Sequence, residues 1–258
     1  MGLEQRSISQ QFDDNASMPS FLPAKAMIFA AGLGTRMRPL TAHVPKPLVT
    51  VAGKPLLDHM LDRFATAGVE TAIVNVHYLA SQIEAHLASR KTPKILISDE
   101  REKLLDQGGG IAKVLPSLGP EPFFLANTDA FWVEGPADNL RNLADAWDPQ
   151  QMDILLLVAT VAGSVGVDSP GDFNMAPDGR LTRRPEREIA PFVYTGVGIV
   201  KPTLFKDETR DIFPLAPFFF SAAEKGRLFG QRLDGLWFHI GTPQAIEEAE
   251  RKLARGPT

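Results

Sequence analysis

The chain of 258 residues carries 27 Lys and Arg against 31 Asp and Glu, a formal net charge of −4, and 44% of its residues are hydrophobic. This is the composition of an ordinary globular protein, and its slightly acidic balance argues against a broad nucleic-acid-binding surface. The absence of cysteine excludes a disulfide framework, a thiolate metal site and a cysteine nucleophile, and it fits a cytoplasmic protein. No apolar run approaches the roughly 18 residues that cross a bilayer, so we expect no membrane partner.

The N-terminal stretch MGLEQRSISQQFDDNASMPS is polar and lacks the apolar core of a signal peptide. We therefore expect residues 1–24 to form a disordered extension and residues 25–258 to form a single domain. The rhythm of the sequence changes near residue 160, which suggests a first half over about residues 25–160 and a second half over about residues 161–258.

In the first half, short apolar runs alternate with amphipathic segments. Strands are predicted over residues 27–31, 71–76, 94–97, 122–126 and 152–158, and helices over residues 56–67, 79–88, 110–115 and 137–147. Strands that are apolar almost throughout and alternate with helices indicate an α/β fold with a mostly parallel sheet.

The second half is less regular. Residues 164–187 are rich in Gly, Pro, Asp and Arg, which is typical of short hairpins and loops. Strands are predicted over residues 192–200 and 237–240, and helices over residues 215–225 and 244–253.

A glycine-rich loop, AAGLGTRMRPL over residues 30–40, follows the first predicted strand. It is not a dinucleotide fingerprint, because Met37 occupies the position of the third glycine, and the Walker phosphate-loop pattern is absent. What remains is a loop with two arginines, followed by Lys46 between two prolines. Backbone N–H groups and guanidinium groups of this kind can bind phosphate oxygens, although a solvated basic turn is the alternative.

The run AAGLGTRMRPLTAHVPKPLVTVAGKPLL, residues 30–57, closely resembles the signature of the sugar-1-phosphate nucleotidylyltransferases, which make nucleoside-diphosphate sugars and pyrophosphate. The resemblance extends over about residues 25–253. It implies a Rossmann-like, mostly parallel mixed sheet flanked by helices, with a nucleotide-binding first half and a smaller sugar-binding second half. Within the family, the run LLDQGGGIAKVLPSLG and the short length look most like the bacterial N-acetylmuramate-1-phosphate uridylyltransferases. They also resemble short mannose-1-phosphate guanylyltransferases.

The resemblance implies that a sugar phosphate oxygen attacks the α-phosphorus of a nucleoside triphosphate and that pyrophosphate leaves. Both reactants are anions, so the site must position them and neutralise their charge. The implied catalytic cations are Arg36 and Lys46. The implied nucleotide-binding residues are Ala31, Gly32, Leu33, Gly34, Thr35, Arg36, Gln107, Gly108 and Gly109. The resemblance implies that the last three hold the base. A flexible turn is the alternative, but adjacent glycines are costly unless close approach requires them.

Asp129 follows the carboxyl end of the strand predicted over residues 122–126 and matches the family's metal aspartate, so the implied cofactor is Mg²⁺, which prefers oxygen ligands. The family's second metal aspartate is replaced here by His239. His239 therefore ligates a metal, hydrogen-bonds phosphate or is a packing residue. The implied sugar-binding residues are Asn127, Gly171, Asp172, Arg184, Thr195 and Gly196. Arg184 takes the place of the family's lysine, but its neighbour Arg183 has no counterpart and equally fits a solvated hairpin.

The function expected from this resemblance is coupling of UTP to N-acetylmuramate 1-phosphate in cell-wall recycling. A guanylyltransferase using GTP and mannose 1-phosphate is the alternative within the same class. A sugar-nucleotide sensor with impaired chemistry is the alternative of a different class, and the His239 replacement is what supports it. The expected partners are a nucleoside triphosphate (UTP or GTP) and a sugar 1-phosphate, with no nucleic acid, and the expected state is a monomer or homodimer.

Overall fold

The computed structural model describes residues 21–255, so most of the predicted extension lies outside the described residues. Residues 21–24 belong to the folded part, because the ring of Phe21 stacks on Trp147 with 6.3 Å between ring centroids. In chain order the strands and helices are β1 Lys25–Phe29, β2 Thr50–Val51, β3 Lys54–Pro55, α1 Leu56–Ala67, β4 Thr71–Val76, α2 Ala80–Leu87, β5 Lys94–Asp99, α3 Asp106–Leu118, β6 Phe123–Asn127, β7 Ala130–Glu134, α4 Asn139–Asp145, β8 Ile154–Thr160, β9 Phe173–Met175, β10 Leu181–Arg183, β11 Phe192–Val200, α5 Ala216–Glu224, β12 Leu228–Arg232, β13 Gly235–His239 and α6 Pro243–Ala254.

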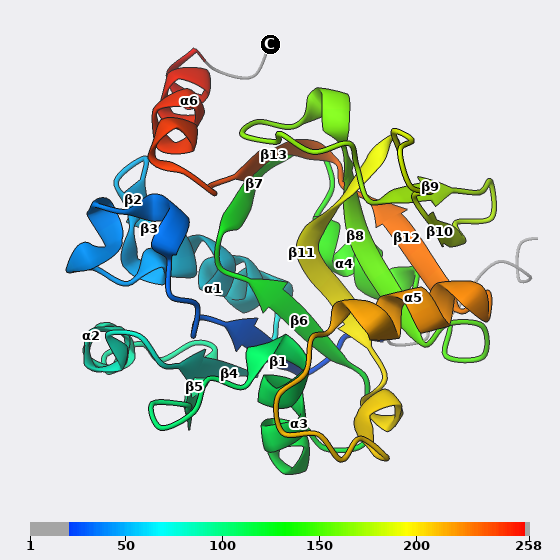
Figure 1. Cartoon of the computed structure of the whole chain (residues 1–258), viewed down its shortest axis with the longest axis horizontal. Helices are drawn as coiled ribbons and strands as arrows, with labels where there is room; N and C mark the ends of the chain where they lie inside the picture. Colours follow the sequence, from blue (N-terminus) through cyan, green and yellow to red (C-terminus); the bar gives the residue numbers. More distant parts are fainter. Residues whose placement is uncertain (1–20, 256–258) are drawn as a thin grey trace, which may run out of the picture.

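A central sheet is built from strands that come from both halves of the described chain (Figure 1). Within residues 21–255 it has nine strands, in the order β10-β9-β11-β6-β1-β4-β5, with β8 paired to β11 and β12 paired to β8. The strands β6, β1, β4 and β5 are parallel to one another, whereas β11 is antiparallel to β6 and β8. The alternation of apolar runs predicted this α/β sheet, and its mixed arrangement is the one that the family resemblance implied.

The strand order reverses beside β1. The chain passes from β1 outward through β4 and β5 and then returns to β6 on the other side of β1. Such a reversal separates the loops at the carboxyl ends of the strands and leaves a crevice there. At this level Asn75 and Asn127 are the register partners of Phe29, one on each side.

Helices cover both faces of the sheet. The helices α1, α2 and α4 pack on one face, and α3 and α5 on the other. Helix α1 buries the apolar face that its 3.6-residue periodicity predicts, including Leu57, Leu61 and Phe64. It ends at Gly68, whose left-handed φ of +101° allows its N–H to donate to the carbonyls of Phe64 and Ala65. No helix among residues 21–255 is long and apolar enough to cross a membrane.

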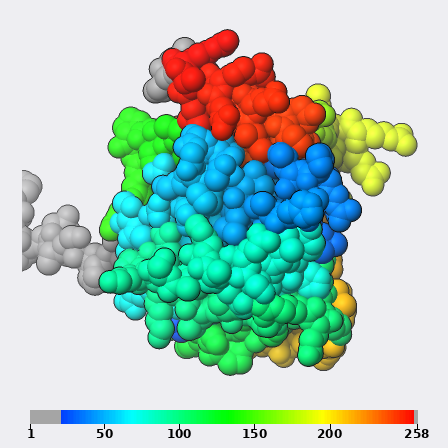
Figure 2. All heavy atoms as spheres, turned by 90° about the vertical axis from the view of Figure 1, so that its left-hand side faces the viewer, coloured from blue at the N-terminus to red at the C-terminus, as the bar shows by residue number. Residues whose placement is uncertain are grey.

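A further apolar cluster brings together segments from the beginning and the end of the described chain. The strands β7 and β13 form a separate antiparallel pair, and α6 packs beside them against Met37 and Val51 from the early loop region. Figure 2 shows the C-terminal helix, in red, lying directly on the blue early segment. The backbone N–H of Ala52 donates to Glu250 of this helix. The carboxyl side of the sheet is therefore flanked by chain segments far apart in sequence.

The structure differs from the predicted elements in the strands β7 and β12 and at the start of α3. Strands β7 and β12 were not expected, because β7 follows β6 after only two residues and the partners of both strands are distant in sequence. Helix α3 begins at Asp106 rather than at residue 110, so the three glycines lie inside its first turns. Glycine disfavours a helix intrinsically, but tertiary contacts described below compensate for it here.

Candidate active site

Two cavities open at the carboxyl edge of β1 and β6. The first has a volume of about 440 Å³ and lies over β1, β4 and the start of α3. The second has a volume of about 470 Å³ and lies between β11, β13 and the segment at residues 166–169. Asn127 and Asp129 line both cavities. The site therefore consists of two chambers with a shared wall.

The glycine loop borders the first cavity, but its two glycines serve different purposes. Gly34 has φ +62° and a Cβ on it would lie 3.1 Å from Thr41 and 3.2 Å from Lys46, so the chain itself requires glycine at this tight turn. Gly32 lines the cavity, and a Cβ on it would meet nothing within 4 Å. A ligand can therefore approach the backbone at Gly32. Ala31 lines the same cavity, whereas Leu33 and Thr35 line neither.

Lys46 lies where the two cavities meet. The preceding Pro45 is extended, and Lys46 begins a short 3-10 turn that directs its side chain to the end of β6. Its Nζ donates to Oδ2 of Asp129 at 3.0 Å. This pair is partly buried, and it holds a cation at the wall that the cavities share.

His239 approaches the same carboxylate from β13. Its Nε2 lies 3.8 Å from Asp129 Oδ2, and its Nδ1 lies 3.3 Å from the carbonyl of Gly166. The ring can serve the site in two ways: an N–H at Nε2 donates toward the carboxylate, whereas an N–H at Nδ1 donates to the Gly166 carbonyl and leaves Nε2 as a ligand for a cation. Burial alone would raise the pKa of the Asp129 carboxyl, but His239 and Lys46 together hold that pKa well below its ordinary value of 3.8.

The side chains at this point fit a divalent cation that is held partly by the protein and partly by the phosphates of a substrate. Among residues 21–255 no three His, Asp or Glu side chains gather at one point, so the protein alone supplies at most Asp129 and His239. Mg²⁺ is commonly held by one or two carboxylates together with substrate phosphates, and the Asp129 carboxylate meets this need. The imidazole suits borderline metals better than Mg²⁺.

Arg36 lines the second cavity rather than the first. It lies in a short 3-10 turn, Thr35–Met37, in which Met37 is buried and Arg36 is exposed. Within the described part of the chain its guanidinium has no hydrogen-bond or ion-pair partner. An unpaired arginine at a cavity mouth can bind a phosphate through two parallel hydrogen bonds.

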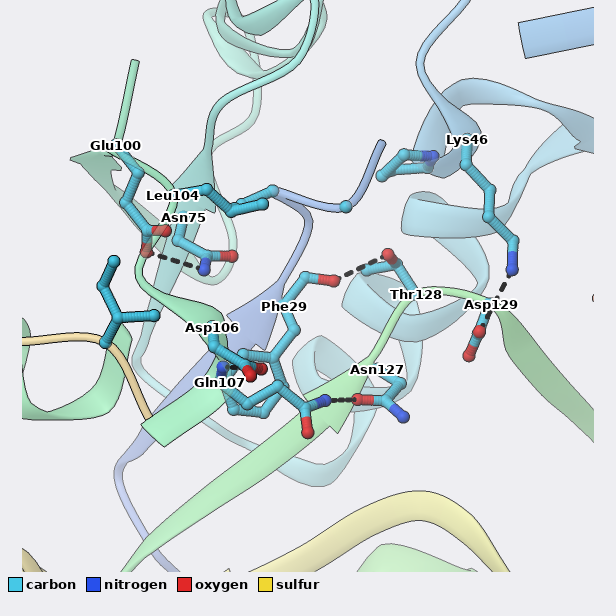
Figure 3. A pocket seen from close by; sticks show the side chains of 14 residues that line it. Phe29, Lys46, Asn75, Glu100, Leu104, Asp106, Gln107, Asn127, Thr128 and Asp129 are labelled. Atoms are coloured by element: carbon cyan, nitrogen blue, oxygen red, sulfur yellow. Dashed lines mark hydrogen bonds and ion pairs between the residues drawn. The ribbon is translucent and has the colours of Figure 1, made fainter. Parts of the chain in front are cut away.

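The first cavity has two chemically different ends (Figure 3). Lys46 and Asp129 lie at one end, and Glu100, Leu104 and Asp106 lie at the other. Between them the side chain of Gln107 donates to Asn127 at 2.8 Å. Phosphate groups therefore have their natural place near Lys46, away from Leu104.

A buried relay fixes the two ends relative to each other. Asn75 accepts a hydrogen bond from the N–H of Ala30 at 2.7 Å and donates to Glu100 at 2.8 Å. The other oxygen of Glu100 accepts from the N–H of Leu105 at 3.1 Å. The relay links the start of the glycine loop to the start of α3, and the sequence reading missed it because its members come from separate strand ends.

The glycines at the start of α3 are occupied by the chain itself. A Cβ on Gly108 would lie 2.3 Å from the ring of Phe213, and one on Gly109 would lie 2.2 Å from the carbonyl oxygen of Asp211. Neither glycine lines the first cavity, whereas Gln107 does. The close approach predicted at these glycines is therefore made by residues 211–213.

The second cavity contains two of the predicted sugar-binding residues beyond Asn127. Gly196 has φ +91°, and a Cβ on it would lie 2.9 Å from Asn127, so glycine lets β11 pass the shared wall. Thr195 also lines the cavity, with its hydroxyl donating to the carbonyl of Leu157. Further groups that the sequence did not reveal also line it, among them Trp237, Thr242 and residues 166–169. The available signal in the sequence was the glycine at position 166, which the structure shows with φ +72°.

Gly171, Asp172 and Arg184 line neither cavity. The Arg184 guanidinium donates to the carbonyls of Gly171, Pro185 and Glu188. Asp172 accepts from the N–H of a β11 residue at 2.8 Å. Asp172 therefore ties the start of the β9–β10 hairpin to β11, and Arg184 ties the loop after β10 back to Gly171.

A glycine loop after the central strand, with charged groups at the switch point of a mostly parallel sheet, defines the nucleotide-binding class of α/β proteins. The family model described as nucleotidyl transferase matches residues 25–160. The chain is 48% identical to the N-acetylmuramate alpha-1-phosphate uridylyltransferase of Caulobacter vibrioides, over 90% of this chain and 98% of that one. It is 35% identical to the protein of that name from Neisseria meningitidis, over 88% and 96% of the two chains.

More distant relatives include the mannose-1-phosphate guanylyltransferase catalytic subunit beta of Danio rerio, which is 30% identical over 90% of this chain and 69% of that one. The fold resembles that of a UDP-glucose pyrophosphorylase solved with UDP-glucose, with a TM-score of 0.68 at 17% identity over 90% and 99% of the chains. HddC from Yersinia pseudotuberculosis also has a TM-score of 0.68, at 21% identity over 89% and 99%. The chain belongs to the nucleotidyl transferase family and is a sugar-1-phosphate nucleotidyltransferase, as residues 30–57 predicted.

Proposed function

We propose that this enzyme couples UTP to N-acetylmuramate 1-phosphate, giving the UDP-sugar and pyrophosphate. The observation that carries the proposal is the pair of cavities that share Asp129, with Lys46 at the junction. Two anionic substrates need separate binding sites that meet at the reacting phosphorus. Two cavities with a shared wall can provide such sites. The choice of UTP and of this sugar follows the two uridylyltransferase relatives.

In the proposed reaction the triphosphate lies in the first cavity, with its phosphates toward Gly32 and Lys46. The sugar phosphate lies in the second cavity, near Arg36, Thr195 and Gly196. An oxygen of the sugar phosphate forms a bond to the α-phosphorus, and the bond from that phosphorus to the bridging oxygen of the pyrophosphate breaks. Lys46 and Arg36 neutralise charge on the transferring group and need no covalent chemistry of their own.

A divalent cation completes this proposal. The family generally uses divalent metal ions, and Mg²⁺ held by Asp129, with His239 beside it, would neutralise charge on the substrate phosphates when bound. Lys46 donates to Asp129, so it orients the carboxylate and adds a further positive charge to the junction.

A panel of pyrophosphate-release assays tests the proposal. UTP, GTP, dTTP and CTP are each paired with N-acetylmuramate, mannose and N-acetylglucosamine 1-phosphates, and products are identified by mass spectrometry. We expect the highest kcat/KM for UTP with N-acetylmuramate 1-phosphate. Preference for GTP with mannose 1-phosphate would establish the guanylyltransferase instead. Tight binding of UDP-sugar without turnover of any pair would establish the sensor.

A further inference from the structure

A short segment of the second half, residues 210–213, is anchored on the start of α3. The N–H groups of Gly108 and Gly109 donate to the carbonyl of Phe213 at 3.0 and 3.3 Å. The N–H of Phe213 donates in turn to Leu105, and Lys103 forms an ion pair with Asp211 at 2.9 Å. The segment therefore satisfies helix-terminal N–H groups that would otherwise need water or a ligand.

The fit between this segment and the helix is close. The ring of Phe213 is 1% exposed and lies where any side chain on Gly108 would be, and Asp211 does the same at Gly109. The guanidinium of Arg210 lies over that ring at 5.2 Å from its centroid. Hydrogen bonds, an ion pair and a buried ring thus fix the backbone of residues 211–213 relative to α3.

Ile212 is the one residue of the segment that lines the first cavity, and 51% of it is exposed. Ile212 lies at the same end of the cavity as Leu104 and Asp106, because its neighbours Asp211 and Phe213 are anchored at the start of α3. An aliphatic side chain held there by a fixed backbone provides apolar contact area for a ligand.

The two ends of the cavity determine how a nucleotide can lie in it. A triphosphate directed toward Lys46 places its base at the opposite end, where Figure 3 shows Leu104. Ile212 lines the cavity beside the start of α3, at this same end. We propose that Ile212 is a nucleotide-binding residue whose side chain contacts the face of the nucleotide base. This inference rests on the proposed function, since it assumes that the first cavity holds the nucleoside triphosphate.

A contact with the face of a ring has a distinct consequence. An alkyl group makes apolar contact with any base but none with pyrophosphate, which has no base. Truncation of Ile212 should therefore weaken nucleotide binding while it leaves pyrophosphate binding and the chemical step unchanged. Removal of three partly desolvated carbons corresponds to a loss of about five- to tenfold in affinity.

The experiment compares Ile212→Ala, Ile212→Leu and Ile189→Ala. Ile189 is a matched control, because it is 82% exposed and lines neither cavity. Titration calorimetry measures the Kd of UTP and of pyrophosphate for each protein, and steady-state assays separate KM from kcat. We expect Ile212→Ala to raise the Kd and the KM for UTP about five- to tenfold, with pyrophosphate affinity and kcat within twofold of wild type. Ile212→Leu should restore most of the affinity, and Ile189→Ala should behave as wild type.

Unchanged UTP affinity in Ile212→Ala would overturn the inference, as would equal weakening of UTP and pyrophosphate. Thermal unfolding of each variant confirms that the fold is retained, which the exposure of both positions favours. Failure of the proposed function shows in the wild-type enzyme, which would then bind UTP without forming the UDP-sugar or would prefer another nucleotide. With another preferred nucleotide, the same Kd comparison is made with that nucleotide. The binding measurements still decide the role of Ile212 in that case.

Discussion

The Nζ of Lys46 lies 3.0 Å from Oδ2 of Asp129, although 83 positions separate the two residues. Lys46 follows the glycine loop after β1, and Asp129 follows β6, the strand parallel to β1 on one side. The pair therefore lies at the switch point of the sheet, and it forms part of the wall between the two cavities.

Replacement of Lys46 by Met should abolish most turnover without unfolding the protein. The uncharged side chain keeps the apolar stem but removes a cation from the transferring phosphoryl group, which should lower kcat about 10²- to 10³-fold. Pyrophosphate release at saturating substrates measures this effect. Lys54→Met is the matched control, because Lys54 also pairs with an aspartate, Asp62 at 2.6 Å, but lines neither cavity. Similar losses in both variants would contradict the assignment.

The pKa of Asp129 should be measurably depressed. His239 and Lys46 hold it well below 3.8 despite burial, so the ionised carboxylate stabilises the folded state above pH 3.8. That stabilisation is lost as the pH falls below this value toward the folded-state pKa. A ¹³C NMR titration, assigned with Asp129→Asn, measures the shift. In Lys46→Met the pKa should move back toward 3.8, and an unchanged titration would show that Lys46 does not interact with the carboxylate in solution.

Alanine at Gly108 should affect stability, whereas alanine at Gly32 should affect substrate binding. In Gly108→Ala the new methyl overlaps the buried ring of Phe213, which should lower the free energy of unfolding by about 2–3 kcal/mol. In Gly32→Ala the methyl enters open space, so stability should change by less than about 0.5 kcal/mol while the KM for the triphosphate rises. Urea unfolding and steady-state kinetics measure the two effects. A stable Gly108→Ala protein would indicate that the 210–213 segment is not held as described.

Arg184→Ala should mainly destabilise the loop that follows β10. The guanidinium donates to three backbone carbonyls, and the loss of these bonds should cost about 1–2 kcal/mol of stability. Because Arg184 lines neither cavity, the KM for the sugar phosphate should stay within about twofold to threefold. A tenfold rise in that KM at unchanged stability would instead support the direct contact with sugar that the family resemblance implies.

His239→Asp should change the metal dependence of the reaction. A second carboxylate beside Asp129 adds a hard oxygen donor and a negative charge, so the Mg²⁺ concentration for half-maximal activity should fall several-fold. His239→Ala should raise it. Activity measured against Mg²⁺ and Mn²⁺ concentration tests both variants. Identical metal curves for all three proteins would assign His239 to packing against β13 and the Gly166 carbonyl.

The sequence alone determined the elements whose signal is local. Helix α1 and the strands β4 and β11 have the predicted bounds, because the periodicity of apolar residues in them is continuous. The family and the reaction class were also readable, since residues 30–57 carry the glycine loop and Lys46 within one contiguous stretch. Local chemistry of this kind leaves a mark in a short window of sequence.

Only the tertiary structure decided which residues face a cavity. The sequence suggested that Gly108 and Arg184 contact a ligand. In the structure residues 211–213 occupy the space beside Gly108, and the guanidinium of Arg184 donates to backbone carbonyls. The contribution of Ile212 to the first cavity was equally invisible, since it depends on contacts between segments about 100 positions apart. Long-range packing sets the direction in which each side chain points, and the spacing of residues along the chain does not encode it.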